Sequence, residues 1–317
     1  MLFIKFFNRL RFFLDHKFQH FIKKKIFPTF AKYGFSSVLK TKRFTVNQNS
    51  QTEIHSLVCH KDVYCYLYCI KSLLIYLHNC SVIVHDDGSL TYKDKLHLKK
   101  HIKGIIIYES IQANRLVLPK LQKYPLLKKL RGQYVLLKKL TDFSLLSKTG
   151  KIIALDSDIL FFNRPEELIQ WSESNKKEAL LSDESPVISY QDRFLPNTSF
   201  KYVRSLNSGL ICYYANMLDL DLAEKVFALP QFNNTSFRYN NVDDQQFMAV
   251  NFGEAKSQKN LSVIRLSPFL YVHNRQLQRK DVKAKHYWFA KYSLKSLLIY
   301  LRDKKIVHKS IQSELNH

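Results

Sequence analysis

The chain of 317 residues contains little glycine, only seven residues, and has no G-x-G-x-x-G or G-x-x-x-x-G-K-S/T string. Those strings form the backbone loops that hold the phosphates of dinucleotides and nucleoside triphosphates. A dinucleotide-binding or P-loop protein therefore has no basis in this sequence. With only eight prolines as well, long flexible linkers are not expected, and the length suits one large α/β domain or two small ones.

Cysteine is also scarce, with five residues and no C-x-x-C pair. An odd number without metal-type spacing predicts reduced, mostly buried thiols and a cytoplasmic setting. Cys65 and Cys69 lie four apart in a predicted helix, so we expect both in the core. Because Lys5, Arg9 and Arg11 interrupt the apolar N-terminal stretch, no run approaches the roughly 20 apolar residues of a membrane span, and we expect neither a span nor a signal peptide.

Acidic residues are few relative to basic ones: 26 Asp and Glu against 50 Lys and Arg give a formal net charge of +24. Such a surplus favours polyanionic partners, namely nucleic acid, anionic lipid or phosphorylated substrates. The cations concentrate at the two ends. Residues 1–43 contain eleven Lys and Arg against one acid, and residues 275–309 contain eleven against two.

The N-terminal 27 residues show apolar side chains at helical spacing, with most cations away from that stripe. This pattern is typical of a helix in the interface of an anionic membrane, and equally of a helix that packs its stripe on the parent domain. We predict a basic amphipathic segment over residues 1–43, a central domain over 44–292 and a basic helical tail over 293–317. The basic ends predict a cytoplasmic protein attached peripherally to the inner face of the cell membrane.

Strands and helices alternate along the central domain, which predicts an α/β fold with a mostly parallel central sheet. Residues 44–52 are polar and are predicted to form a linker. The predicted strands cover residues 54–59, 81–85, 105–108, 152–155, 159–162, 179–182, 187–190, 210–214 and 261–266. The predicted helices cover residues 63–78, 93–102 and 115–142, and a further helix begins near residue 243.

Asp156-Ser157-Asp158 directly follows the apolar strand predicted at residues 152–155. In an open α/β sheet, ligands bind outside the carboxyl ends of the strands. Two carboxylates two residues apart can share one hard divalent cation, which can in turn bridge a diphosphate. Charged residues between two buried strands cost free energy unless they are paired or bind a metal. We therefore interpret Asp156 and Asp158 as metal ligands rather than as a solvated turn.

The run from Ile152 to Phe162, followed by Pro165 and by Glu167-Leu168, resembles the D-x-D region of GT-A-fold glycosyltransferases, most of all family-eight-like enzymes. The resemblance covers roughly residues 54–292. It implies a Rossmann-like single domain of GT-A type. In that family the D-x-D string binds manganese and the diphosphate of the nucleotide sugar, which implies Mn²⁺ or Mg²⁺ as cofactor.

Further matches follow in the family's order, and they imply roles for residues far apart in the sequence. The resemblance assigns Asp156 and Ser157 to the donor, and it assigns the sugar-facing Asn-x-Gly step to Asn207, Ser208 and Gly209. It identifies Asp244 and Gln245 as the pair beside the transferred sugar, our candidate catalytic residues. It gives His286 as the third metal ligand and Lys291 as a diphosphate contact.

Residues nearer the start complete the expected donor site. The resemblance places His60 and Asp62 at the nucleobase, and Asp86 and Asp87 resemble the nucleotide loop of the wider superfamily, more so family-two enzymes. Lys138 is a further phosphate candidate.

Each of these residues also has a plainer interpretation. Asp86-Asp87-Gly88 and the Asn207 step are common turns, and Asp244 could satisfy the first backbone N–H groups of a helix. The Lys138 and Lys139 pair could be a solvated basic face, and His273 competes with His286 as ligand.

The resemblance implies transfer of a sugar from a nucleotide sugar, uridine-linked, to an acceptor hydroxyl in envelope polysaccharide or glycolipid synthesis. Glycan, lipid-linked and protein acceptors stay open. Retention of configuration is favoured, although no Gly follows His286 and no Pro follows Lys291, as they often do in the family. Two alternatives remain. The charge of +24 and the paired carboxylates fit a nucleic-acid-binding protein or metal-dependent nuclease, and the basic ends fit a non-catalytic membrane-surface protein.

Overall fold

The computed structural model describes residues 18, 21–183, 195, 199–229, 243–273 and 280–313. Its strands are β1 (Phe44–Thr45), β2 (Thr52–Val58), β3 (Ser81–Asp86), β4 (Ile102–Lys103), β5 (Ile106–Tyr108), β6 (Lys151–Leu155), β7 (Ile159–Phe161), β8 (Glu178–Asp183), β9 (Leu206–Tyr214), β10 (Ser262–Arg265), β11 (Tyr271–His273) and β12 (Ala284–His286). Its main helices are α2 (Phe27–Phe35), α3 (Val63–Leu74), α4 (Tyr92–His101), α5 (Ser110–Val117), α6 (Pro125–Gln133), α7 (Lys138–Leu146), α8 (Glu166–Glu173), α10 (Leu220–Phe227), α13 (Asp243–Lys259) and α14 (Leu294–Ser313). Shorter helical turns are η1 (Ile22–Ile26), η2 (Ser36–Lys40), η3 (His60–Asp62), η4 (Val135–Leu137), η5 (Ala215–Met217) and η6 (Trp288–Lys291).

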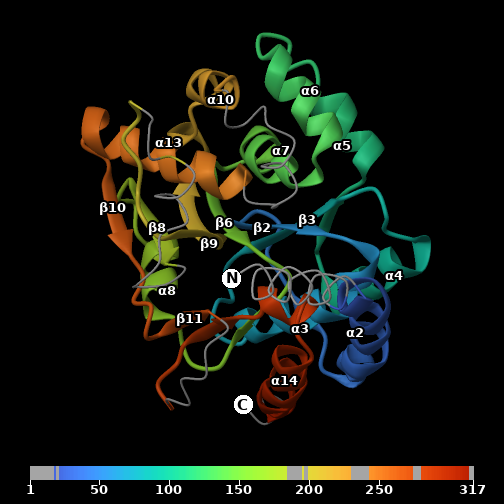
Figure 1. Cartoon of the computed structure of the whole chain (residues 1–317). Coiled ribbons are helices and arrows are strands. Elements are labelled where there is room, and N and C mark those ends of the chain that lie inside the picture. Colours follow the sequence, from blue (N-terminus) through green and yellow to red (C-terminus); the bar gives the residue numbers. More distant parts are fainter. Residues whose placement is uncertain are drawn as a thin grey trace, which may run out of the picture.

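A seven-stranded sheet in the order β10-β8-β9-β6-β2-β3-β5 forms the centre of the protein (Figure 1). Strand β9 runs antiparallel to its neighbours β6 and β8, and the other neighbouring pairs are parallel. The predicted α/β fold with a mostly parallel central sheet is therefore confirmed.

Both faces of this sheet are covered by helices, because its central strands are apolar on both sides. In β6, Ile153 and Leu155 face a core that includes residues of α3, α8 and α14. Ile152 and Ala154 face the opposite core, which includes residues of α6, α7, α10 and α13. This alternation is the period-two pattern of a strand.

The strand order reverses between β2 and β6. From β2 the chain passes outward to β3 and β5, and it then returns to place β6 on the other side of β2. Connections that leave two neighbouring strands in opposite directions open a crevice at their carboxyl ends. Asp62, in the turn after β2, and Asp156, directly after β6, therefore flank the same crevice.

A second sheet, β11-β12-β7, brings the end of the chain to this crevice. Strand β7 begins directly after the D-x-D step, and β12 pairs antiparallel with it so that His286 lies opposite Ile159. The backbone N–H of Tyr287 donates to the carbonyl of Asp158 at 2.9 Å. This register places the His286 ring beside the Asp158 side chain.

Three local predictions were wrong. The helix predicted over residues 115–142 is divided into α5, α6 and α7, because Pro125 starts a new helix and Tyr124 before it leaves the helical region. Residues 44–52 are not a linker, since β1 pairs with β4 and Phe44 and Val46 are buried. Strand β9 begins at Leu206 rather than residue 210, so the Asn207 step lies within the strand and not in a turn. The strand predicted at residues 187–190 lies outside the described residues.

The two basic ends pack onto the central unit where they are described. Phe35 of α2 and Tyr300 of α14 are buried in one core together with strand residues of the sheet. The boundaries at 43/44 and 292/293 stay predictions. All five cysteines are free, and Cys65 and Cys69 are buried, as the sequence predicted. Among the described helices, none combines the length and apolar character of a membrane span.

Candidate active site

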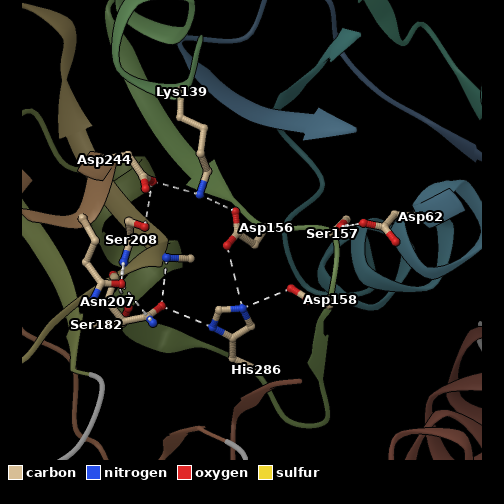
Figure 2. Close-up of polar contacts among 12 residues, drawn as sticks. Asp62, Lys139, Asp156, Ser157, Asp158, Ser182, Asn207, Ser208, Asp244 and His286 are labelled. Atoms are coloured by element: carbon tan, nitrogen blue, oxygen red, sulfur yellow. Dashed lines mark hydrogen bonds and ion pairs between the residues drawn. The ribbon is translucent and has the colours of Figure 1, made fainter. Parts of the chain in front are cut away.

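The structure brings Asp156, Asp158 and His286 together at the carboxyl end of β6. One ligand atom of each residue can be chosen so that all three lie within 4.8 Å of one another. Nε2 of His286 lies 3.0 Å from Oδ1 of Asp158 and 3.8 Å from Oδ2 of Asp156 (Figure 2). Asp158 and His286 are buried, and the side chain of Asp156 is 27% exposed. The three residues are those that the sequence predicted as metal ligands.

These residues fit a divalent cation. Two ligands of one hard ion lie at most roughly 4–5 Å apart, because each lies about 2.0–2.6 Å from the ion. Carboxylate oxygens with one imidazole nitrogen suit manganese and magnesium better than softer ions that prefer thiolates. The Asn207 amide oxygen lies 3.2 Å from Nδ1 of His286 and can fix the orientation of the ring, as supporting groups do for metal-binding histidines.

Lys291 is a fixed cation beside this group. Its Nζ donates to Oδ2 of Asp62 at 2.9 Å and lies 3.5 Å from Oδ2 of Asp158. Burial lowers the pKa of Lys291, but the charges of Asp62 and Asp158 outweigh it and raise that pKa well above its ordinary value. Burial likewise raises the pKa of Asp158, yet the charges of Lys291 and His286 prevail and hold it below the ordinary value. The charged forms of both groups are therefore stabilised.

Lys139 of α7 links the metal-site carboxylate to a second one. Its Nζ lies 2.7 Å from Oδ1 of Asp156 and 3.3 Å from Oδ2 of Asp244 (Figure 2). Burial lowers the pKa of Lys139, but the two carboxylates raise it above its ordinary value overall. Lys138, the neighbour that the sequence favoured, points elsewhere. A single sequence offers no signal that separates two adjacent lysines in one helix.

The predicted sugar-facing residues form one hydrogen-bonded cluster beside Lys139. The Ser208 hydroxyl donates to Oδ2 of Asp244 at 2.9 Å, and the Ser208 N–H lies 3.3 Å from Oε1 of Gln245. The Asn207 amide N–H₂ approaches the same Gln245 oxygen at 3.5 Å. Asn207, Asp244 and Gln245 are all buried, so strand β9 and the start of α13 present them to the crevice as one polar group.

Gly209 fits this site because it has no side chain. An ideal Cβ on Gly209 would lie 2.5 Å from Cε1 of His286 and 2.8 Å from the Asn207 side-chain oxygen. Its N–H donates to that same oxygen, and its carbonyl accepts the N–H of Asp156 at 2.8 Å. The backbone of β9 therefore connects the Asp156, Asp158 and His286 group to the cluster of Asn207, Ser208, Asp244 and Gln245.

The residues predicted at the nucleotide end lie further along the crevice. Asp62 also accepts the Ser157 hydroxyl, at 3.4 Å. The side chain of His60 is 54% exposed, and its Nδ1 contacts Oδ2 of Asp94 at 2.6 Å. The backbone N–H of His60 also donates to the Ser89 hydroxyl at 2.9 Å.

Asp86 and Asp87 shape the loop after β3. Oδ1 of Asp86 accepts the backbone N–H groups of Gly88 and Leu90, and Oδ1 of Asp87 accepts from Ser89. Lys138 donates to the backbone carbonyls of Asp86 and Asp87 at 3.3 and 3.1 Å. These contacts are typical of a tight turn that a lysine stabilises. An ordinary turn is one of the two interpretations that the sequence left open, the other being a nucleotide loop.

His273 stands behind His286 rather than in the metal group. The two residues are opposite each other in the parallel pair β11–β12, and their rings meet edge to face with centroids 5.2 Å apart. Within the described residues, Asp156, Asp158 and His286 are the only such group of three or more potential ligands.

Comparison with known proteins gives structural likenesses only. No protein-family model and no curated protein matches the chain. Mouse xyloside xylosyltransferase 1 is similar with a TM-score of 0.48 and 13% identity over 74% of this chain and 96% of that one. The galactosyltransferase LgtC, solved with donor and acceptor sugar analogs, gives 0.46 and 12% over 81% and 95%.

A third similar structure is the glycosyltransferase GlyE of Streptococcus pneumoniae, with a TM-score of 0.46 and 10% identity over 84% of this chain and 64% of that one. All three proteins are glycosyltransferases. At TM-scores below 0.5 the likeness carries no conclusion about the chemistry of this chain, which has to come from the side chains themselves.

Proposed function

We propose that the protein is a metal-dependent glycosyltransferase that moves a sugar from a uridine-linked nucleotide sugar to an acceptor hydroxyl. The observation that carries this proposal is the convergence of Asp156, Asp158 and His286 at the crevice where the strand order reverses. A crevice of this kind is where open α/β sheets bind nucleotides. The polar cluster of β9 and α13 lies directly beside the three ligands, where a sugar joined to a diphosphate would extend.

A manganese or magnesium ion held by Asp156, Asp158 and His286 would offset the charge of the donor diphosphate and of the departing nucleotide. Lys291 adds a second positive charge on the same side, and its raised pKa keeps it protonated. Because Asp62 and Asp158 already hold the ammonium group, little reorganisation is needed when a diphosphate arrives.

The sugar would be held by Asn207, Ser208, Asp244 and Gln245. Carboxylate and amide oxygens accept hydrogen bonds from sugar hydroxyls, and the Asn207 amide can donate one. Lys139 lies between Asp244 and Asp156 and forms an ion pair with each carboxylate. The nucleoside would lie toward His60, Asp62, Asp86, Asp87 and Lys138, along the carboxyl ends of β2 and β3.

We favour retention of configuration, in which the departing phosphate accepts the proton of the incoming hydroxyl and no protein base is required. An acceptor in envelope polysaccharide or glycolipid synthesis fits the basic ends of the chain.

Release of nucleoside diphosphate from a panel of nucleotide sugars, with Mn²⁺ and with a chelator, tests the proposal. Asp158→Asn keeps the size of the side chain and removes one charge, so we expect turnover to fall by about 10²-fold or more. The exposed Glu173→Gln removes the same charge outside the site and should leave turnover unchanged. Equal turnover in wild type and Asp158→Asn would overturn the assignment. Metal-dependent cleavage of DNA or RNA without donor hydrolysis would favour the nuclease alternative.

A further inference from the structure

Helices α2 and α14 lie next to each other in the lower part of the molecule (Figure 1), and the solvent-facing side of each carries large apolar side chains. On α2 the exposed side chains include Phe30 and Tyr33, the latter 70% exposed. On α14 they include Leu294, Leu298 and Ile306, with Leu298 63% exposed. We call this face, together with the exposed cations named below, the α2–α14 surface. Groups of exposed apolar side chains of this kind mark interaction sites.

The two helices are joined firmly. A Cβ on Gly34 would lie 2.6 Å from a methyl carbon of Leu301, which shows how closely α14 packs against α2 at this point. The rings of Phe35 and Tyr300 meet beneath with centroids 4.5 Å apart. Lys304 donates to the carbonyl of Gly34 and, at 2.9 Å, to the Ser37 hydroxyl. The exposed apolar side chains of both helices are thus held in one fixed surface.

Both helices also carry an excess of positive charge. Residues 21–43 contain seven Lys and Arg and no acid. Along α14, positions 294, 298, 305 and 309 follow helical spacing, so Leu294 and Leu298 share one side of the helix with Lys305 and Lys309. The acid within α14, Asp303, is buried and held by Lys285 at 2.8 Å and Tyr287 at 2.7 Å. The outward charge of this helix is therefore positive.

We infer that the α2–α14 surface binds an anionic membrane. Aromatic and aliphatic side chains that stand among lysines can enter the boundary between head groups and acyl chains, while the lysines meet anionic head groups. A nucleic acid would satisfy the lysines but would leave Phe30 and Leu298 without an apolar partner. The combination of exposed apolar groups and positive charge therefore favours lipid.

Both helices of this surface begin close to the candidate active site. Helix α14 begins three residues after Lys291, and Nζ of Lys291 lies 5.8 Å from the ring centroid of Phe27, the first residue of α2. A bound membrane would therefore lie beside the crevice, where an acceptor carried by lipid could reach it. This last consequence rests on the proposed function, whereas membrane binding itself does not.

Co-sedimentation of the full chain with vesicles tests the inference. We expect binding to phosphatidylcholine vesicles that contain phosphatidylglycerol, and little binding to phosphatidylcholine alone. Lys305→Glu with Lys309→Glu should weaken binding at least about tenfold, because two attractive charges become repulsive. Lys128→Glu with Lys129→Glu makes the same change on the exposed face of α6, at the opposite end of the molecule, and should have little effect (Figure 1).

A second pair of variants tests the apolar contribution. Phe30→Ser with Leu298→Ser should also weaken vesicle binding, whereas Ile111→Ser with Leu116→Ser, which are exposed on α5, should not. All four double variants alter exposed side chains, and unchanged thermal denaturation would verify their folding. Donor hydrolysis in solution should persist in all of them, so loss of vesicle binding is distinguishable from failure of the proposed reaction.

Three results would overturn the inference. The first is equal binding of wild type to neutral and anionic vesicles. The second is a combination of two observations: both α2–α14 variants bind vesicles as well as wild type does, and deletion of residues 1–20 abolishes binding. The membrane anchor would then be the N-terminal 20 residues rather than the α2–α14 surface. The third is binding to duplex DNA as tight as to anionic vesicles and unaffected by Phe30→Ser with Leu298→Ser, which would indicate a nucleic-acid surface.

Discussion

Nε2 of His286 lies 3.0 Å from Oδ1 of Asp158, although 128 residues separate the two in the sequence. The contact follows from strand pairing, because β12 runs antiparallel to β7 and β7 begins directly after Asp158. The chain continues from β12 into η6, and Nζ of Lys291, the last residue of η6, lies 3.5 Å from the other carboxylate oxygen of Asp158. One short sheet therefore delivers both an imidazole and a cation to the carboxylate pair.

The position of His286 depends on the missing side chain of Gly209. We predict that Gly209→Ala weakens Mn²⁺ binding about 10- to 100-fold, because the new methyl group displaces the imidazole and its Asn207 partner. Isothermal titration of Mn²⁺ measures this.

Gly132→Ala is the matched control for that substitution. A Cβ on Gly132 meets no atom within 4 Å, and the residue lies in α6, where alanine is favoured over glycine by about 0.5–1 kcal/mol. It should leave Mn²⁺ affinity intact and slightly raise the free energy of unfolding. Unaltered Mn²⁺ affinity in Gly209→Ala would show that His286 is not a ligand.

Because Lys139 forms ion pairs with two carboxylates, we predict that its removal strongly destabilises the protein. Lys139→Met leaves the buried Asp244 and the half-buried Asp156 without their shared cation, which should lower the free energy of unfolding by about 3–5 kcal/mol. Chemical denaturation measures the change. Lys128→Met removes the same charge at an exposed position and should stay within about 0.5 kcal/mol of wild type. A similarly small effect of Lys139→Met would mean that the two carboxylates do not need this lysine.

A buried lysine outside the site predicts a pH dependence. Lys71 of α3 donates to the Thr41 hydroxyl and contacts Nδ1 of His101 at 2.9 Å. Burial, with a smaller contribution from Arg43, lowers the pKa of Lys71 to about 7. In the unfolded chain that pKa is about 10.4, so between pH 7 and 10 the unfolded state binds the extra proton. The contribution of Lys71 to the free energy of unfolding therefore rises with pH in that window, by up to about 1.4 kcal/mol per pH unit.

Lys71→Met should remove this rise. The free energy of unfolding measured by urea at pH 7 and at pH 9 should differ less in Lys71→Met than in wild type, while the exposed Lys99→Met should keep the wild-type difference. Identical pH slopes in Lys71→Met and wild type would contradict the lowered pKa.

The sequence predicted the sheet well because its strands are short apolar runs that alternate with helical segments. Local sequence pattern correctly predicted the buried strand before Asp156, and it predicted a helix near residue 243, where α13 lies. The broken helix at Pro125 was missed because apolar periodicity continues across it, although proline is a strong local signal.

Other features could not be predicted from local pattern. Lys139 rather than Lys138 meets Asp156 because of the rotation of α7 against β6, which tertiary packing sets. The close approach of Gly209 to His286 likewise depends on how two separate sheets meet. The roles implied for His60, Asp86 and Asp87 stay predictions, since their described contacts are also those of ordinary turns.

The affinity of a nucleotide sugar with and without metal tests the central claim most directly. Isothermal titration of UDP-glucose and UDP-galactose into the full chain should give at least about tenfold tighter binding in Mn²⁺ than in a chelator, because the ion joins the carboxylate pair to the diphosphate. Asp158→Asn should abolish that difference. Equal affinity in Mn²⁺ and in chelator, or no binding of any nucleotide sugar, would contradict a metal-dependent glycosyltransferase.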